Sequence, residues 1–385
     1  MRNSMKPIAI TAASSISASG SSPSEQIAAY SNGQSKLSWS TELGAWVGKV
    51  SAEGEQALSG IRSAYPRLDR SVQLAIFVAQ QAVEQANWSE DVKEYGIQLG
   101  SSRGATGLWE ASYEQFRQEG RVKVTTSPLT TLGNLSSWVG QHLGQQGWRA
   151  GHSVTCSTAA HALVQAVAWL RAGLTDRFLV GGAEAPLTPF TLAQMQAMRI
   201  YSKANREEEW PCLPYRRQAQ NGMVLGEGAT AFCLERAPDR LPMGWLKGVG
   251  FAQEKISSPT SVDPAGKGIA QAMKMAMREA GIDEVDLIVT HSPGTPKGDA
   301  AELTAIRGLF PEQPALTNTK WLHGHGLGTS AGLSLELALL ALKDSSLAAL
   351  PYAWEGQTSW PTQVQHVLVN ALGFGGNCVS LLVGR

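Results

Sequence analysis

The chain has 385 residues, 43% of them hydrophobic and 17% charged, so it can bury a large core and does not have a disordered composition. Its formal net charge of zero gives no reason to expect nucleic acid or a membrane surface as a partner. Four cysteines without disulfide or zinc-ligand spacing, the lack of a secretory h-region and the lack of a run of about 18 apolar residues predict a cytoplasmic protein without a membrane span.

Apolar runs alternate with helical periodicity along the first half of the chain. Residues 7–11 form a predicted strand, residues 70–86 a helix with apolar side chains at helical spacing, and residues 95–100 a buried strand. Residues 157–173 are apolar on most faces, which predicts an internal helix, and residues 178–182 form the next strand. Strands and helices in alternation predict an α/β protein with a largely parallel sheet.

The second half, from about residue 245, repeats this alternation. It has predicted helices at residues 269–280, 300–309 and 330–342, and predicted strands at residues 285–290 and 367–370. The segment LGEGATAFCL at residues 225–234 is echoed by LGFGGNCVSL at residues 372–381, and both are glycine-rich turns before an apolar strand. Such turns are common, so coincidence is one explanation; the other is an internal duplication. The duplication predicts an N-terminal half of residues 1–240 and a C-terminal half of residues 241–385.

Cys156 is the candidate nucleophile. It stands at a predicted junction between a strand and a helix, where the helix dipole and free backbone N–H groups favour a thiolate. The same N–H groups can stabilise an oxyanion. A small buried cysteine that only packs is the alternative, and the small residues around it leave room for a substrate.

Two histidines and a lysine in the second half are further candidates. His291 follows an apolar strand, at the kind of position where ligands bind in α/β sheets, although a structural role is equally possible. His325 lies in the segment KWLHGHGLG together with His323 and Lys320. Metal binding is a rival interpretation of the two close histidines, but no carboxylate or cysteine near them completes a site, so no metal is expected.

Six segments in the same order resemble the motifs of the elongating β-ketoacyl-acyl-carrier-protein synthases over nearly the whole chain. They are VTCSTAAHAL, FLVGGAEA, GMVLGEGA, THSPGTPKGDAAE, TKWLHGHGLG and NALGFGGNCVSL. The resemblance implies the thiolase fold, in which two βα halves stack as a five-layered α-β-α-β-α sandwich. The paired histidines favour the elongating type over initiating synthases, which use a histidine and an asparagine.

The resemblance also implies roles for the motif residues. Cys156 would accept an acyl chain from the phosphopantetheine arm of an acyl carrier protein, and His291 and His325 would assist loss of carbon dioxide from a malonyl-carrier protein and stabilise the enolate. Lys320 would support the second histidine electrostatically. Asp299 and Glu302 would be structural acids. Phe374 would be a gate that shares the oxyanion hole with Cys156, and Thr295 would contact the pantetheine.

The resemblance implies no cofactor of the chain's own, a carrier protein as partner, and a homodimer or a heterodimer with a related subunit. A non-condensing chain-length factor is the main rival, although such subunits typically lose the nucleophile. A degradative thiolase would need a second catalytic cysteine, and Cys378 resembles a core residue. Basic side chains that could meet the carrier form two clusters: Arg62, Arg67 and Arg70; and Lys203, Arg206, Arg216 and Arg217.

Three departures from the family pattern predict a polyketide or aryl-polyene type branch. Pro293 replaces a pantetheine-contacting threonine, so that only Thr295 remains. The segment Pro214-Tyr215-Arg216 lacks the usual acidic residue, and the stretch after His325 is about two residues longer than the common form.

Overall fold

The computed structural model describes residues 6–385, apart from residues 89–93, 133, 216–220 and 259. Within these residues the main sheet has ten strands in the order β10-β9-β11-β12-β8-β1-β7-β6-β4-β5. The first set of strands is β1 (Ile8–Ile16), β4 (Gly96–Gly100), β5 (Arg149–Ala150), β6 (Arg177–Glu184) and β7 (Gly228–Glu235). The second set is β8 (Gly244–Gln253), β9 (Leu287–Val289), β10 (Ala315–Thr317), β11 (His366–Gly373) and β12 (Asn377–Gly384).

The two sets repeat one topology. In the first set β7 pairs antiparallel with β1 and β6, and β4 pairs parallel with β6 and β5. In the second set β12 pairs antiparallel with β8 and β11, and β9 pairs parallel with β11 and β10. The two echoed glycine-rich segments lead into β7 and β12, which occupy equivalent places. A short antiparallel pairing between β1 and β8 joins the sets into one sheet.

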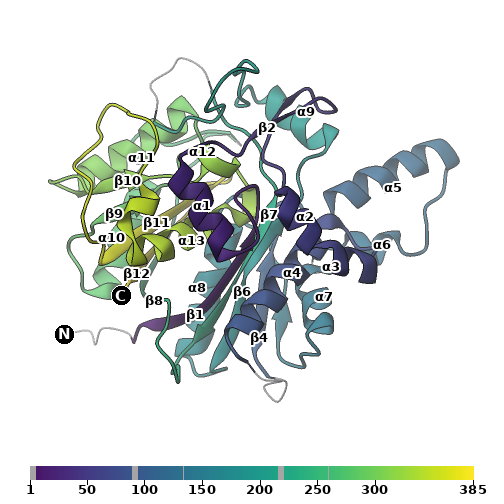
Figure 1. Ribbon diagram of the computed structural model, residues 1–385, viewed down its shortest axis with the longest axis horizontal. Coiled ribbons are helices and arrows are strands. Elements are labelled where there is room, and N and C mark those ends of the chain that lie inside the picture. The colour runs from purple at the N-terminus through teal and green to yellow at the C-terminus, as the bar shows by residue number, and fades with distance from the viewer. Residues whose placement is uncertain (1–5, 89–93, 133, 216–220, 259) are drawn as a thin grey trace.

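Helices lie in three layers around these strands (Figure 1). On the outer side of the first set, α4 (Arg70–Gln85) packs on β1, β6 and β7, and α7 (Asn134–His142) packs on β4 and β5. On the outer side of the second set, α10 (Lys267–Ala280) packs on β8 and β12, with α11 (Pro296–Leu309) beside it. Between the sets, α8 (Thr158–Arg171) and α13 (Ser330–Lys343) contact each other. The predicted five layers and the internal position of the nucleophile helix are thus confirmed.

Corresponding loops of the two sets both end at the central helix pair. The loop from β5 to α8 carries Cys156, and the loop from β10 to α13 carries Lys320 and His325. The repeat therefore places the nucleophile and one candidate histidine on equivalent loops. His291 follows β9, as predicted for a ligand-binding position at the end of a strand.

The predicted helix boundaries are correct where the apolar periodicity is strong. They are less accurate where the residues of the first turn determine the start of the helix. The helix predicted at residues 70–86 is α4, which starts after Asp69, whose carboxylate accepts the N–H of Ser71 at 2.9 Å. The helix predicted from residue 300 instead begins at Pro296. Proline is favoured in the first helical turn because it has no N–H to leave unpaired, and Asp299 places an acidic group in that turn.

Shorter elements complete the fold. They are α1 (Pro23–Asn32), β2 (Ser38–Ser40), β3 (Ala45–Val47), α2 (Ala52–Ala57), α3 (Ser59–Ala64), α5 (Thr106–Glu119), α6 (Thr126–Thr130), α9 (Pro189–Ala197), α12 (Lys320–His323), η1 (Leu327–Thr329) and η2 (Ser345–Ala348). None of the described helices is long and apolar enough to cross a membrane.

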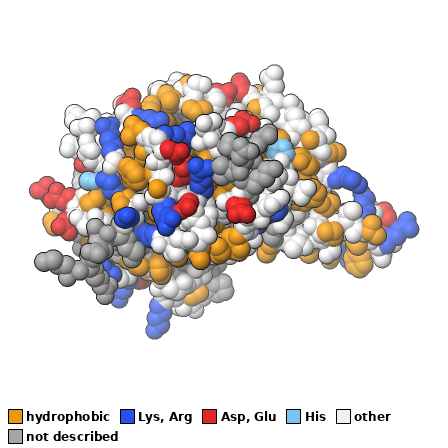
Figure 2. All heavy atoms as spheres, turned by 90° about the horizontal axis from the view of Figure 1, so that it is seen from below, with side chains coloured by type: hydrophobic (Ala, Val, Ile, Leu, Met, Phe, Trp, Pro, Cys, Tyr) orange, Lys and Arg blue, Asp and Glu red, His pale blue; other side chains and the backbone are white. Residues whose placement is uncertain are grey.

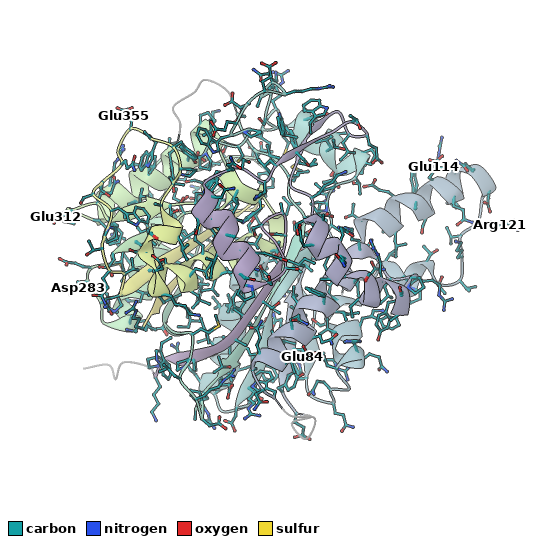
Figure 3. All side chains as sticks on the ribbon, viewed as in Figure 1. Glu84, Glu114, Arg121, Asp283, Glu312 and Glu355 are labelled. Atoms are coloured by element: carbon teal, nitrogen blue, oxygen red, sulfur yellow. The ribbon has the colours of Figure 1, made fainter. Side chains whose placement is uncertain are left out.

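Helices α5 and α6 project from the body of the molecule (Figure 1). Figure 3 marks the far part of this projection with Glu114 and Arg121, and Figure 2 shows hydrophobic and basic side chains there. Trp109, Tyr113 and Phe116 on α5 are all at least 50% exposed, and the rings of Trp109 and Tyr113 stack. Their spacing places them along one side of the helix, so the projection carries an uncovered apolar stripe.

A buried carboxyl in the central helix predicts an unusual pH dependence of stability. Glu336 on α13 accepts a hydrogen bond from the Ser15 hydroxyl at 2.9 Å, and burial raises its pKa to about 7. The folded protein therefore keeps a proton that the unfolded chain releases above about pH 4.5, so stability is lost as pH rises towards 7. We expect Glu336→Gln to stabilise the protein at pH 8 by up to about 3 kcal/mol and to have little effect at pH 5.

Thermal unfolding of both proteins at the two pH values measures this difference. Glu312→Gln serves as the control because Glu312 is exposed at the periphery (Figure 3). An equal shift of Tm at pH 5 and pH 8 for Glu336→Gln would contradict the expectation.

Candidate active site

Cys156 occupies a tight turn immediately before the central helix α8. Its side chain is buried, and the residue is 7% exposed. The turn is closed by the Thr158 hydroxyl, which donates to the Thr155 carbonyl at 2.6 Å and accepts the N–H of Val154 at 2.9 Å. The backbone N–H groups of Cys156 and Phe374 both act on the sulfur and lower its pKa. Cys156 therefore lies at the predicted junction between a strand and a helix.

The resting nucleophile is a thiol, in contrast to the thiolate expected from the sequence. Burial raises the pKa of Cys156 to about 12, and the Glu184 carboxylate acts in the same direction. The Lys320 ammonium and the two backbone N–H groups lower the pKa but do not offset burial. Deprotonation at neutral pH must therefore be coupled to the arrival of a reacting group.

The two candidate histidines face each other in the same cavity as Cys156. The ring centroids of His291 and His325 are 5.3 Å apart with an angle of 79° between the planes. All three residues line one cavity of about 1040 Å³. The structure thus brings the thiol into one cavity with both imidazoles, each of which lies more than 130 positions after Cys156 in the sequence.

Both imidazoles are neutral at neutral pH. Burial lowers the pKa of His291 and of His325 well below 6.5, and the Lys320 ammonium acts in the same direction on both rings. Nδ1 of His325 lies 2.7 Å from the Ser330 hydroxyl. When Ser330 donates this bond, the ring hydrogen of neutral His325 is on Nε2, which is then available as a donor.

Lys320 is a fully buried cation at the start of α12. Its Nζ has no hydrogen-bond partner within the described part of the chain. Burial lowers its pKa to about 8, while Glu302 and other nearby acidic groups raise it. Lys320 therefore remains largely protonated at neutral pH and acts on both imidazoles, not only on the second one as expected from the sequence.

Asp299 and Glu302 hold the backbone that carries His291. The Glu302 carboxylate accepts the N–H of His291 at 3.0 Å and the N–H and hydroxyl of Ser292 at 2.8 and 2.9 Å. The Asp299 carboxylate accepts the N–H of Thr295 at 3.2 Å. Burial raises the pKa of Asp299 to about 7. Both acids contact the turn after β9 through the backbone, as a structural role requires.

Phe374 and Thr295 both line the cavity, as does Pro293 in the place of the missing threonine. Phe374 is 41% exposed, so the alternative of a core phenylalanine is wrong. It lies in the glycine-rich turn between β11 and β12, where Gly375 and Gly376 have left-handed backbone angles of 87° and 81° in φ. Only glycine adopts such angles readily, which explains the glycines around Phe374.

Sequence reasoning missed the walls of the cavity. One part is apolar and is lined by Met195, Met198, Met223 and Leu327, and two exposed cations, Arg199 and Lys297, lie on the lining as well. These residues come from α9 and the segment after it, from the segment before β7, from η1 and from the start of α11. No motif marks them, because isolated methionines and cations have no spacing pattern that distinguishes a cavity wall from a core or a surface.

The structure also bears on the two clusters of basic side chains that were expected to meet a carrier protein. Arg70 and Arg62 are paired with acids: Arg70 with Glu227 at 2.7 Å and Arg62 with Glu55 at 2.8 Å, so they offer little free charge to a partner. Arg206 lies 4.7 Å from the centre of the Trp39 ring. The predicted partners in its cluster, Arg216 and Arg217, lie outside the described residues.

Two rival site types find no support in the described residues. Cys378 is buried in β12 and is absent from the cavity lining, so it does not offer the second nucleophile of a thiolase. No group of three or more His, Cys, Asp or Glu side chains in the described part of the chain could hold a metal ion.

Comparison with known proteins agrees with this geometry. The curated 3-oxoacyl-[acyl-carrier-protein] synthase 2 of Staphylococcus aureus is 29% identical over 341 residues, which cover 81% of this chain and 83% of that protein. A chain from a solved complex of a type II polyketide synthase acyl-carrier protein with its ketosynthase superposes with a TM-score of 0.85 at 20% identity, over 99% of both chains.

A chain from the ketosynthase and chain length factor complex of Xenorhabdus doucetiae superposes with a TM-score of 0.81 at 23% identity, over 100% of this chain and 99% of that one. These likenesses show the fold and confirm the thiolase-type architecture. The β-ketoacyl synthase N-terminal domain family matches residues 5–240, and the C-terminal domain family matches residues 243–351. The chain therefore belongs to the β-ketoacyl synthases, a family of acyl-transferring enzymes that form carbon–carbon bonds.

Proposed function

We propose that this protein condenses an acyl chain, held as a thioester on Cys156, with a malonyl group on an acyl carrier protein. One observation carries the proposal: Cys156, His291, His325 and Phe374 line a single cavity. A chain-length factor has no need of a nucleophile with this arrangement around it. The condensing role is therefore favoured over the non-condensing alternative.

In the first half of the reaction, the Cys156 sulfur attacks the thioester carbonyl of the incoming acyl chain. The carbonyl oxygen gains negative charge, and the N–H groups of Cys156 and Phe374 stabilise it. The bond to the arm's sulfur then breaks, and the proton of the Cys156 thiol ends on that sulfur. Since the resting thiol is protonated, a neutral imidazole in the cavity is suited to carry this proton between the two sulfurs.

In the second half, the bond between the malonyl carboxylate and its α-carbon breaks and carbon dioxide leaves. The electron pair forms an enolate, whose oxygen is stabilised by N–H donors of His291 and His325. The enolate carbon attacks the Cys156 thioester, and the sulfur leaves as a thiolate that takes one proton from solvent, which balances the negative charge of the lost carboxylate. Burial keeps the rings neutral in this step, and the charge of Lys320 also opposes their protonation. Asp299 and Glu302 keep His291 in place.

The proposal requires no cofactor of the chain's own, because the phosphopantetheine arm belongs to the carrier protein. We propose Thr295 as a contact for that arm, since it lines the cavity beside Pro293. We also propose residues 1–240 and 241–385 as the two domains, because the repeat passes from one strand set to the other between β7 and β8. A cytoplasmic location and a polyketide or aryl-polyene product stay predictions.

A homodimer, or a heterodimer with a related subunit, is part of the proposal. The relatives include a ketosynthase solved with its chain length factor. Two features of this chain support such a partner: among the described residues β5 is an edge strand of the main sheet, and α5 carries the uncovered apolar stripe.

Two cations at the cavity predict how the carrier is recognised. Arg199 and Lys297 are exposed and contribute to the cavity lining, where they would meet the phosphodiester of the arm or the acidic surface of a carrier protein. We expect Lys297→Glu to raise KM for the carrier protein about five- to tenfold at low salt and to leave kcat nearly unchanged. The increase should shrink at high salt, because exposed charges are screened.

Steady-state kinetics with the acyl-carrier protein at two salt concentrations measure this effect. Lys343→Glu, at the end of α13 and outside the cavity lining, is the matched control. An equal rise of KM in both variants would show that net charge, and not the place of Lys297, sets recognition.

The proposed function is tested by the intact mass of the protein after incubation with an acyl-carrier protein. Condensation predicts a gain of one acyl mass, its loss on addition of malonyl-carrier protein, and formation of a β-ketoacyl product. The assay is run with the protein alone and with candidate partner subunits. An unchanged mass under both conditions would favour the non-condensing role.

A further inference from the structure

Thr155, the residue before the nucleophile, has an unusual backbone conformation. Its φ is 50°, in the left-handed region. A β-branched residue rarely adopts this region, and the conformation persists only where surrounding contacts enforce it. The Ser157 N–H, which donates to the Val154 carbonyl at 3.2 Å, and the Thr158 hydroxyl supply such contacts. The turn therefore fixes the direction in which the Thr155 side chain points.

That direction is towards the turn that carries Phe374. The Thr155 hydroxyl donates to the Phe374 carbonyl with a distance of 3.2 Å. Phe374 lines the same cavity as Cys156, and its backbone N–H lowers the pKa of the Cys156 thiol. Thr155 is thus bonded through its side chain to the residue that supplies one of the two donors at the nucleophile.

The approach between the two segments is close. A Cβ atom at position 373 would come within 3.1 Å of the Ser157 hydroxyl oxygen and closer still to that of Thr155, so glycine is needed there. From the other side, the Asn377 amide donates to the Phe374 carbonyl at 3.1 Å, and the Glu254 N–H donates to the Gly376 carbonyl at 2.8 Å. These two bonds come from the C-terminal half, whereas the bond from Thr155 comes from the N-terminal half.

We propose that Thr155 is a positioning residue that ties the Phe374 turn to the nucleophile turn and thereby aims the Phe374 N–H at the sulfur and at the oxyanion formed there. The inference rests on the proposed function for its catalytic consequence. The two N–H donors come from opposite halves of the molecule, so their relative placement depends on contacts between the halves. The Thr155 hydroxyl is such a contact, one residue from Cys156.

The test compares Thr155→Ser, which keeps the hydroxyl, with Thr155→Ala, which differs from it only by that hydroxyl. Thr155→Val keeps the shape of threonine and lacks the donor. The first measurement is the rate of Cys156 alkylation by iodoacetamide as a function of pH, followed by intact mass. The second is kcat and KM for acyl transfer from an acyl-carrier protein.

We expect Thr155→Ala and Thr155→Val to slow alkylation about fivefold at pH 8 and by a similar factor at neighbouring pH values, because a higher pKa lowers the thiolate fraction throughout this range. Acyl transfer should lose about five- to tenfold in kcat with little change in KM, because the donor acts on the transition state. Thr155→Ser should stay within about twofold of the wild type in both measurements. Thr304→Val, which removes an exposed threonine hydroxyl bonded to the Ala300 carbonyl on α11, is the control.

Two outcomes would overturn the inference: alanine and serine variants that behave alike, or an alanine variant with an unchanged pH profile and kcat. Comparison of the serine and alanine variants keeps the test decisive if Thr155→Val does not fold. Alkylation needs only the thiol. If the wild type gains no acyl mass, the proposed function fails, while the alkylation profiles still decide whether Thr155 positions the Phe374 N–H.

Discussion

Cys156→Ser is expected to abolish formation of the acyl-protein and to lower the rate of condensation by about a thousandfold or more. The hydroxyl of serine is a much weaker nucleophile than a thiol. Moreover, the site has no group that would deprotonate it strongly: both imidazoles have pKa values well below 6.5. Intact mass after incubation with an acyl-carrier protein measures the first effect, and release of carbon dioxide with product analysis measures the second.

Cys378→Ala is the matched control, because Cys378 is buried in β12 and does not line the cavity. It should gain an acyl mass like the wild type. An acyl mass that persists in Cys156→Ser and disappears in Cys378→Ala would move the nucleophile to the C-terminal half and revive the thiolase interpretation. Peptide mapping of the acylated wild type locates the modified residue independently.

The second large effect is expected at the histidines. His325→Ala should slow decarboxylation of the malonyl-carrier protein by about 100- to 1,000-fold, the range found when one oxyanion donor is removed. Formation of the acyl-protein should suffer less, since its oxyanion is stabilised by the N–H groups of Cys156 and Phe374. A separate measurement of each half-reaction therefore distinguishes the role of His325 from that of Cys156.

The pH dependence of decarboxylation adds a further criterion. Both imidazoles have pKa values lowered well below 6.5, so both stay neutral between pH 6.5 and 7.5, and the rate should not rise with acid across this window. A marked rise towards pH 6.5 would show that an imidazolium is the donor. His366→Asn, at the start of β11 and outside the cavity lining, is the control and should retain the wild-type rate.

The sequence predicted well what depends on short-range pattern. Periodicity located α4, α8 and α13 to within a few residues, because each has a long apolar face or is apolar on most sides. The segments around Cys156, His291 and His325 were recognised because each is a compact motif that resembles one of the family's motifs. The repeat was visible because the glycine-rich turns before β7 and β12 have similar composition.

Properties that arise from contacts across the fold could not be predicted in this way. The protonated state of Cys156 results from burial by several segments and from the nearby Glu184 carboxylate. Glu184 lies in the recognised motif FLVGGAEA, but the motif does not show that its charge acts on Cys156. Arg70 resembled a solvated cation until the fold placed it against Glu227, 157 positions away. The bond from Thr155 to Phe374 spans 219 positions, and no local pattern indicates it.

The repeated topology has a consequence for how the chemistry is shared. The loop from β5 to α8 and the loop from β10 to α13 occupy equivalent places in the two strand sets. One of them carries a thiol, and the other carries an imidazole and an ammonium. Two equivalent positions of one topology thus carry different chemistry, with the proposed site of covalent attachment on one loop and proposed charge-stabilising groups on the other. Because the paired central helices hold the two loops together, the thiol of one loop and the imidazole of the other reach a single cavity.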